Sequence, residues 1–362
     1  MDRGKWFWLN NIEGIGIAKI RELLNNFQDA ENIYDLTKED LWGHMYLSEQ
    51  DKENLLSEAI KDKAAQKFEK LLASNVKCIF PFDAEYPGRL LELYDKPNIL
   101  YYVGRIPPAD RRSVAIVGSR NCSYYGESIA RELAGLLAKH GVNVISGLAK
   151  GIDRSAHEGT VFMGGYTGAV LAGGPDKCYP KQNYNLYMDI LQSGGGIMSE
   201  YGPGEATLPG MFPIRNRIIS GLCEAVIVVE AGHKSGSLIT ANYALEQNRR
   251  ILAVPGRIGD AGCEGSNELI AQGAETITSY EQFLELMELT ETESGKKVST
   301  NLTLANNEKV LYSLLLDFAP KSLETLSEES ELPYSDVFEG LIGLEVRGLI
   351  KEIGKNFYVR IG

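Results

Sequence analysis

The sequence contains no apolar run long enough to span a bilayer, and its first residues, MDRGKWFWLNN, lack the apolar core of a signal peptide. Apolar stretches such as AVIVVEA are too short to cross a membrane. We therefore expect a soluble, cytoplasmic protein that does not contact a membrane.

Metal, redox and hydrolase motifs are also missing. The five cysteines are odd in number and scattered, and no C-x-x-C pair is present to hold zinc or to exchange disulfides. The four histidines belong to no cluster with metal-ligand spacing. No Ser-His-Asp or paired-carboxylate arrangement follows from residue spacing. We predict that the protein holds no metal, has no catalytic residues and is not an enzyme.

The loops that usually cradle nucleotide phosphates do not occur. No G-x-x-x-x-G-K-[ST] is present, and no G-x-G-x-x-G follows the apolar run 114–117. Their absence argues against a bound nucleotide, and we predict no cofactor.

The chain as a whole is acidic, with a net charge of −12. The balance differs between segments: residues 1–70 carry −4, residues 111–260 carry +3 and residues 300–362 carry −4. A polyanion would be drawn to the central segment if its cations share one face. The alternative is charge scattered over a solvated surface, which counting does not distinguish.

The length of 362 residues exceeds the size of one hydrophobic core, so several domains are expected. Residues 1–75 have apolar positions at helical spacing and are predicted to form a SAM-like or helix-hairpin-helix domain. In the break Glu13-Gly14-Ile15-Gly16, the glycines would let backbone N–H groups approach a phosphate. The alternative is a tight turn between packed helices, and the acidity of this segment favours it.

Residues 76–289 are predicted to form an α/β domain with a Rossmann-like parallel sheet. Continuous apolar runs alternate there with helical stretches, which is typical of a parallel sheet covered on both faces. The runs after the first two short strands are 114–117, 142–145, 168–171, 196–198, 225–229 and 251–254.

The last part of the chain has its own apolar pattern. Residues 290–303 are polar and are predicted to be a linker. Residues 304–362 read as three short helices followed by a two-stranded hairpin, which describes a winged-helix domain.

The first candidate site follows the strand 114–117. Ligands of parallel sheets lie at the carboxyl ends of strands, where Gly118, Ser119 and Arg120 would present N–H groups and a guanidinium to an anion. Ser146 and Gly147 follow the next strand and are predicted to bind an anion in the same way. The alternative is that Gly118 only turns the chain and that Arg120 pairs with a neighbouring acid.

A second candidate region, 179–187, mixes a cation and amides with aromatic rings. Lys181 and Asn183 are predicted to contact the nucleic-acid backbone, while Tyr184 stacks on a base, which is the usual mode of sequence-tolerant single-strand binding. Because Tyr184 and Tyr187 lie three residues apart, both could instead be core residues on one helix face.

Two further segments add cations. The run FPIRNRIISG contains Arg215 and Arg217, and another strand-to-helix turn contains Lys234, Ser235, Gly236 and Ser237. Several anion-binding turns along one sheet edge indicate a long polyanion rather than one small ligand. The turns therefore favour a long polyanion, and the aromatic rings of region 179–187 favour a single strand.

These motifs together resemble one protein family. G-S-R, S-G-L-A-x-G-I-D, Y-P-x-x-N, F-P-x-R-N-R-I-I-S-G-L and E-A-x-x-x-S-G-S-L-I-T-A, followed by A-V-P-G, occur in the order seen in DNA-processing protein A, also called Smf. The resemblance covers residues from about 80 to 285. The sequence departs from the family at Leu222-Cys223, where a small residue is common.

The resemblance implies that the protein binds and protects single-stranded DNA in natural transformation, forms a homodimer and loads the RecA recombinase. It also implies that the helix around Asn267, Leu269 and Ile270 lies in a symmetric dimer interface. The residues implied to contact phosphates are Arg120, Lys181, Arg215 and Arg217.

Two other functions stay open. A Rossmann-like hydrolase of nucleoside monophosphates could use the same turns, with Glu200 or Glu230 as the acid. A regulator could bind duplex DNA through the winged helix, but its expected recognition helix, 334–346, carries three acidic residues and no lysine or arginine. That composition indicates a protein-contact module.

Overall fold

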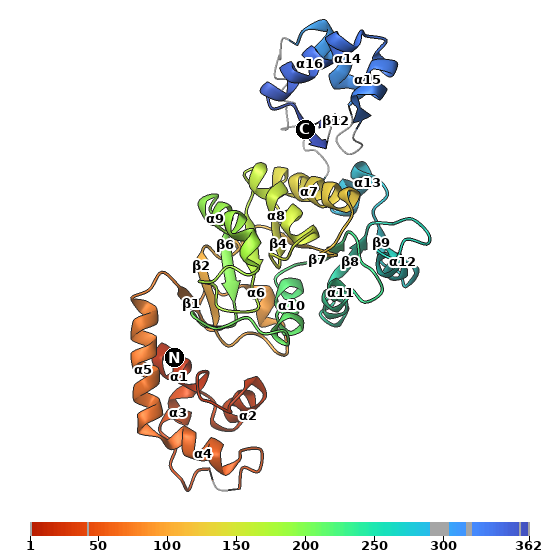
Figure 1. Cartoon of the computed structure of the whole chain (residues 1–362). Helices are drawn as coiled ribbons and strands as arrows, with labels where there is room; N and C mark the ends of the chain where they lie inside the picture. The colour runs from red at the N-terminus through yellow and green to blue at the C-terminus, as the bar shows by residue number, and fades with distance from the viewer. Residues whose placement is uncertain (1, 42, 290–303, 316–320, 355, 361–362) are drawn as a thin grey trace. The chain divides into compact units, whose positions relative to one another are not determined.

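The structure is a computed structural model that describes residues 2–41, 43–289, 304–315, 321–354 and 356–360 (Figure 1). Contacts within the chain divide it into two units, Met1–Phe283 and Leu284–Gly362. The predicted linker, residues 290–303, lies outside the described residues. In the described parts of the chain, no helix combines the length and apolarity needed to cross a membrane.

The first unit begins with helices packed around aromatic side chains, of which Phe7 and Trp8 are almost fully buried. Gly14, with φ of 84°, forms the turn before the second helix. Beside this turn, the Asp51 carboxylate accepts a hydrogen bond from Lys19 Nζ at 2.6 Å. These helices are α1 (Arg3–Leu9), α2 (Ile17–Phe27), α3 (Ala30–Tyr34), α4 (Glu49–Leu56) and α5 (Glu58–Leu72).

A nine-stranded sheet follows in the order β1-β2-β6-β5-β4-β3-β7-β8-β9. The seven strands from β6 to β9 in this order are parallel, while β2 pairs antiparallel with both β1 and β6. The predicted α/β architecture with a large, mostly parallel sheet is confirmed. The strands are β1 (Lys77–Ile79), β2 (Leu100–Gly104), β3 (Ser113–Val117), β4 (Asn143–Ser146), β5 (Thr167–Val170), β6 (Gly196–Ser199), β7 (Ala225–Val228), β8 (Arg250–Ala253) and β9 (Glu275–Thr276).

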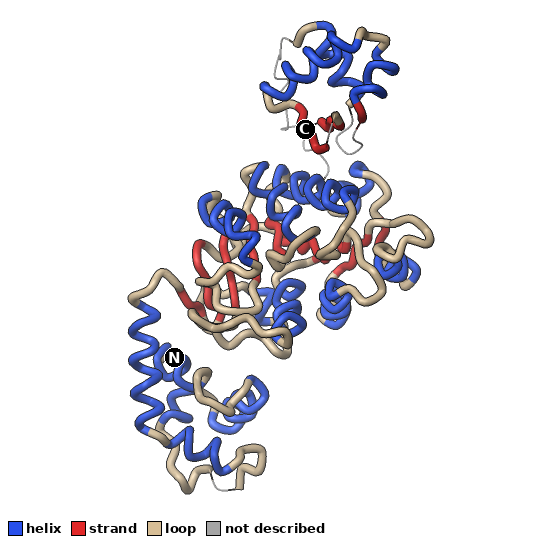
Figure 2. Tube along the Cα trace, viewed as in Figure 1, coloured by secondary structure: helices blue, strands red, loops and turns tan. Residues whose placement is uncertain are grey.

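Helices cover both faces of this sheet, with α7, α8 and α9 on one face and α10 and α11 on the other (Figures 1 and 2). All residues of β3, β4, β5, β6 and β7 are buried, which explains their continuous apolar runs. The helical elements are α6 (Gly88–Leu91), α7 (Tyr124–Lys139), α8 (Ile152–Phe162), the 3-10 turn η1 (Lys181–Asn183), α9 (Tyr184–Gln192), α10 (Met211–Gly221), α11 (Gly236–Glu246), α12 (Glu264–Ala271) and α13 (Tyr280–Leu286), which crosses the boundary between the units.

In the second unit, three helices pack around a core that includes Leu311, Leu326, Leu341 and Leu344. Its antiparallel sheet has the order β10-β12-β11, so it holds one strand more than the predicted hairpin. The added strand is only two residues long, which is too short for a readable alternation of side chains. The elements are α14 (Asn306–Leu314), β10 (Lys321–Ser322), α15 (Leu323–Ser330), α16 (Tyr334–Val346), β11 (Ile350–Gly354) and β12 (Phe357–Arg360).

Candidate functional site

Three strand-to-helix turns meet at one edge of the sheet, after β3, β4 and β7. Strand β3 lies between β4 and β7; β4 to β6 extend the sheet in one direction and β7 to β9 in the other. Such a reversal of strand order is where open α/β sheets bind ligands, because neighbouring turns diverge and leave a crevice.

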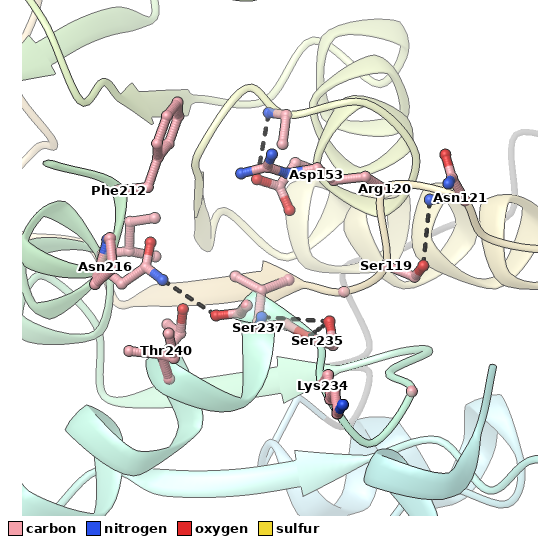
Figure 3. A pocket seen from close by; sticks show the side chains of 18 of the residues that line it. Ser119, Arg120, Asn121, Asp153, Phe212, Asn216, Lys234, Ser235, Ser237 and Thr240 are labelled. Atoms are coloured by element: carbon pink, nitrogen blue, oxygen red, sulfur yellow. Dashed lines mark hydrogen bonds between the residues drawn. The ribbon is translucent and has the colours of Figure 1, made fainter. Parts of the chain in front are cut away.

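A pocket of about 640 Å³ occupies this position, and we call it the switch-point pocket. Figure 3 shows side chains from the turns after β3 and β7 around it, joined by Asp153 of α8 and by side chains of α10 and α11. Its polar and charged lining residues include Ser119, Arg120, Asn121, Asp153, Arg215, Asn216, Lys234, Ser235, Ser237 and Thr240.

The turn after β3 packs closely against its neighbours. The Ser119 N–H donates to the Glu230 carbonyl oxygen at 2.6 Å. Gly118 allows this approach, because a Cβ there would lie 2.5 Å from a side-chain carbon of Ile152 and 2.9 Å from the Glu230 carbonyl oxygen. The close packing leaves Arg120 exposed at the pocket rim.

The Arg120 guanidinium lies 5.1 Å from the centre of the Phe212 ring, and no ion pair of Arg120 with a described acid is present. Phe212 is also 5.6 Å from the ring of Tyr179, which is half exposed. The alternative in which Arg120 is neutralised by a neighbouring acid therefore does not hold within the described residues. A cation stacked on an aromatic face is held in place while its N–H groups stay free for an anion.

Arg215 lines the same pocket and is buried. Its Nη1 donates to the carbonyl oxygens of Val170 and of Gly147, the latter at 2.9 Å. Burial lowers the pKa of the Arg215 guanidinium to about 10, partly offset by the Asp153 carboxylate. Arg215 therefore stays cationic at neutral pH, but part of its hydrogen-bonding capacity is used to brace the floor of the pocket.

Burial also raises the pKa of Asp153, the largest opposing influence being the charge of Arg215. Asp153 accepts hydrogen bonds from the N–H groups of Gly147 at 3.1 Å and Ala149 at 3.3 Å. Ser146 is fully buried, and its hydroxyl donates to the Ile116 carbonyl at 2.6 Å. The prediction that Ser146 and Gly147 contact nucleic acid is corrected: both belong to the framework that shapes the turn after β4.

The turn after β7 supplies the opposite rim. Lys234 is exposed, and Ser235 caps the N-terminus of α11 through its hydroxyl, which lies 2.7 Å from the Ser237 hydroxyl. The Gly236 carbonyl accepts a hydrogen bond from Asn216 Nδ2 at 3.2 Å (Figure 3). All four predicted residues of this turn line the switch-point pocket.

The predicted residues of region 179–187 divide between surface and core. Lys181 is exposed, and Tyr184 is 56% exposed, with its ring parallel to that of Tyr187 at 6.3 Å. Tyr187 is buried, so the core alternative holds for Tyr187 but not for Tyr184. Asn183 is also buried and donates to the carbonyl oxygens of Leu148 and Ala149. Its predicted contact with nucleic acid is therefore corrected to a structural tie between η1 and the turn after β4.

Arg217 does not reach the switch-point pocket. It is 2% exposed, donates to both carboxylate oxygens of Glu200 at 2.7 Å and pairs with Asp95 at 3.0 Å. Arg215 and Arg217 point to different sides of α10 because residues two apart on a helix do not share a face. The prediction that Arg217 binds phosphate is corrected, since its charge is already neutralised inside the protein.

The residues predicted for the dimer interface are mostly engaged within the chain. Leu269 is 6% exposed and belongs to the core that includes side chains of the sheet, with Ile270 packed against that core. The side-chain oxygen of Asn267 accepts a hydrogen bond from the Gly256 N–H at 3.0 Å, and its side-chain nitrogen donates to the Gly256 carbonyl oxygen at 3.2 Å. Leu269 is therefore buried in the core of this chain, and its part in a dimer interface stays a prediction.

The acids considered for a hydrolase lie outside the switch-point pocket. Glu230 accepts hydrogen bonds from the Ser123 hydroxyl at 2.7 Å and N–H at 3.0 Å, while Glu200 pairs with Arg217. Burial raises the pKa of Glu200. Of the described residues that line the pocket, only Asp153 carries a carboxylate.

Sequence reasoning missed part of the wall contributed by α10 and α11. Phe212, Asn216 and Ile219 line the pocket with Arg215, and Thr240 lies one turn after Ser237. These positions follow the i, i+3, i+4, i+7 spacing of one helix face. That periodicity, applied to the run FPIRNRIISG, would have separated Arg215 from Arg217.

A family model described as DNA recombination-mediator protein A matches residues 77–288, which include every strand of the sheet. The chain belongs to this family. The family resemblance stated from the motifs is confirmed, and the protein is thereby placed among the proteins of DNA processing in recombination.

Relatives match the chain over different lengths. Protein Smf of Synechocystis is 32% identical over 97% of this chain and 97% of its own length. Protein Smf of Escherichia coli is 43% identical over 57% of this chain, and the match spans 56% of that relative's length. The Escherichia coli match thus spans little more than half of either chain, whereas the Synechocystis match spans nearly all of both.

Two solved structures are similar to this chain. DNA processing protein A from Streptococcus pneumoniae is 34% identical, with a TM-score of 0.64, and covers 79% of this chain and 98% of its own. The counterpart from Helicobacter pylori, whose structure concerns its single-stranded DNA binding mode, is 30% identical with a TM-score of 0.54 and covers 59% of this chain and 95% of its own.

Proposed function

We propose that this protein binds single-stranded DNA at the switch-point pocket and along the adjoining strand-end turns, and does so without cutting the strand. The observation that carries the proposal is the convergence of Arg120, Arg215 and Lys234 on one pocket in a chain that is acidic overall. A cluster of cations in a protein whose net charge is negative favours a polyanionic ligand.

Arg120, Lys181 and Lys234 would contact phosphates, because all three are exposed. Arg215 would add a fixed positive charge in the wall of the pocket. Tyr184 presents an exposed ring to a base, and Phe212 offers a second aromatic wall inside the pocket. Stacking on such rings tolerates any base, so the binding is expected to depend little on sequence.

The test is a titration of the full protein with single-stranded and duplex DNA of matched sequence at several salt concentrations. Arg120→Ala should lower the salt slope of log K for the single strand by about 0.7, the share of one phosphate contact. Arg111→Ala is the matched control, because Arg111 is exposed near the opposite end of β3. Equal affinity and slope for wild type and Arg120→Ala would contradict the proposal.

We further propose the domain division 1–75, 76–289, 290–303 and 304–362, with a SAM-like first part and a winged helix as the last. Support for the winged helix is the order helix, strand, helix, helix, strand, strand in the second unit. Phosphate binding by the turn around Gly14 is not part of the proposal, because the Asp51 carboxylate lies beside it.

Loading of the RecA recombinase during natural transformation is the role that family resemblance suggests, and we propose it here. A protein partner could contact α16, where Tyr334, Phe338, Ile342 and Val346 are exposed at four-residue spacing. The test measures RecA filament formation on single strands with wild type and with Phe338→Asp. If the wild type does not stimulate filament formation, loading is excluded. If both proteins stimulate it equally, α16 is excluded as the contact.

Homodimer formation stays a proposal, with a changed candidate residue. Ile258 is fully exposed in the loop before α12, whereas Leu269 is core. Light scattering should show that Ile258→Asp dissociates a dimer while Leu245→Asp, an exposed control on α11, does not. A dimer that persists in both variants would place the interface elsewhere.

A further inference from the structure

A second hollow adjoins the switch-point pocket on the other side of Arg120. It has a volume of about 450 Å³ and lies among the turn after β4, α7, α8 and η1, and we call it the α7–α8 groove. Arg120 lines both the pocket and the groove. The two hollows therefore share one cationic rim.

The α7–α8 groove is lined by more cations than acids. Its charged residues are Arg120, Arg131, Lys150, Arg154, Glu127 and Glu158, so the lining carries a net charge of +2. Glu158 accepts from Arg131 at 2.8 Å and from Arg154 at 2.7 Å, so one carboxylate is shared by two guanidiniums. Each of these arginine side chains is about half exposed and keeps further N–H groups for another anion.

Backbone contacts hold the two hollows in register. The Ile152 N–H, at the start of α8, donates to the Ser119 carbonyl at 3.2 Å. Gly151 has φ of 72°, and a Cβ there would collide with the same carbonyl oxygen. The turn that carries Lys150 is therefore fixed against the turn that carries Arg120, and Lys150 is exposed beside it.

We propose that a bound single strand does not end at the switch-point pocket but crosses Arg120 and continues through the α7–α8 groove. Its phosphates there are contacted by Lys150, Arg154 and Arg131. A polymer with one negative charge per nucleotide needs a row of cations, and Lys234, Arg120, Lys150 and Arg154 supply one across two adjoining hollows. Gln182 and Asn183 line the same groove, so the path also leads toward Lys181 and Tyr184. This inference rests on the proposed function and defines the path that the strand takes beyond the switch-point pocket.

The test uses the full-length protein and oligodeoxythymidylates of increasing length, from about 4 to about 16 nucleotides, the range of single-strand sites. Arg120→Ala should weaken binding at every length. Lys150→Ala and Arg154→Ala should leave the shortest oligomers unaffected and lower the salt slope by about 0.7 each for the longer ones. Lys139→Ala is the control, since Lys139 is an exposed lysine in the last turn of α7.

Glu158→Gln gives a result of opposite sign, because removing the carboxylate frees Arg131 and Arg154. It should tighten the binding of long oligomers and leave short ones unchanged. A purely structural role for the Arg131–Glu158–Arg154 cluster would predict a lower melting temperature and no length dependence.

The outcomes separate this path from the proposed function. If Arg120→Ala weakens binding while Lys150→Ala, Arg154→Ala and Glu158→Gln all behave as Lys139→Ala at every length, the path is wrong and the function stands. If Arg120→Ala also has no effect, the proposed function itself fails.

Discussion

The strand-end edge of the sheet and the exposed face of α16 are two surfaces of opposite chemistry in one chain. The first gathers Arg120, Lys234 and Lys150 around turns that fold closely on each other. The second presents Phe338 and Ile342 at helical spacing, with acidic residues on the same helix. The net charge of −12 describes neither surface, because binding depends on the charges that share one face.

The comparison also separates two kinds of exposed residue. At the sheet edge, exposed cations stand on a framework of buried polar groups, such as Asp153 and Ser146. On α16, exposed apolar side chains lie over a core of leucines, and the buried Glu308 carboxylate beside this helix pairs with Arg347 at 3.3 Å. The first arrangement is suited to holding a charged ligand in one geometry, and the second to burying apolar area against a protein.

The largest expected effect comes from a charge placed in either core. Leu269→Arg should destabilise the first unit by about 4 kcal/mol or more, because a buried guanidinium has no partner there. Leu341→Arg should do the same to the second unit only. Calorimetry and single-strand binding check both variants: the first should abolish binding and the second should preserve it. Loss of binding in Leu341→Arg would show that the two surfaces are not independent.

Acidification should distinguish the units next. His157 is fully buried, its Nδ1 lies 2.7 Å from the Thr167 hydroxyl, and burial lowers the pKa of His157 to about 3. The folded protein keeps this histidine neutral, while the unfolded chain protonates it as the pH falls below 6.5. The contribution of the neutral His157 to the free energy of unfolding is therefore present above pH 6.5 and is lost as the pH falls toward 3. Between pH 6.5 and 5 the loss is about 2 kcal/mol.

Urea denaturation at several pH values measures this loss, and His157→Gln should remove its share of the pH dependence. Residues 284–362 contain no histidine, so the stability of the second unit should show no pH dependence from a buried histidine. An unchanged slope in His157→Gln would mean that His157 is protonated in the folded protein.

Exposed tyrosines on the two surfaces should differ in their effect on DNA binding, by a free energy similar to the pH effect. Tyr184→Ala should weaken single-strand binding by about 1–3 kcal/mol and leave the salt slope almost unchanged, because stacking releases no counterions. Tyr334→Ala is the counterpart on α16, where an equally exposed tyrosine should have no effect on affinity. Fluorescence titration at two salt concentrations measures both. If Tyr184→Ala binds single strands as tightly as the wild type, Tyr184 does not stack on a base.

The smallest expected effect is the loss of a single phosphate contact. Lys181→Ala should lower the salt slope for single strands by about 0.7, while Lys351→Ala, an exposed lysine of the second unit, should not change it. Equal slopes for the two variants would remove η1 from the binding surface.

Much of the fold could be predicted because its signals are local. Continuous apolar runs between helical stretches indicated the parallel sheet, since every residue of β3 and β7 is buried on both faces. The turn Gly118-Ser119-Arg120 was predicted correctly as a strand end, because the apolar run of β3 is followed directly by a glycine in the chain. The two-residue strand β10 was missed because it carries no periodic pattern.

The amino-acid order by itself thus determined the fold class, the family and the positions of the strand-end turns, all of which depend on neighbours in sequence. Only the tertiary structure decided that Arg215 lines the pocket while Arg217 is neutralised by Glu200 and Asp95. It also decided that Leu269 belongs to the core. The reason is physical: whether a charge or an apolar side chain is available to a ligand depends on partners distant in sequence, which periodicity and composition do not contain.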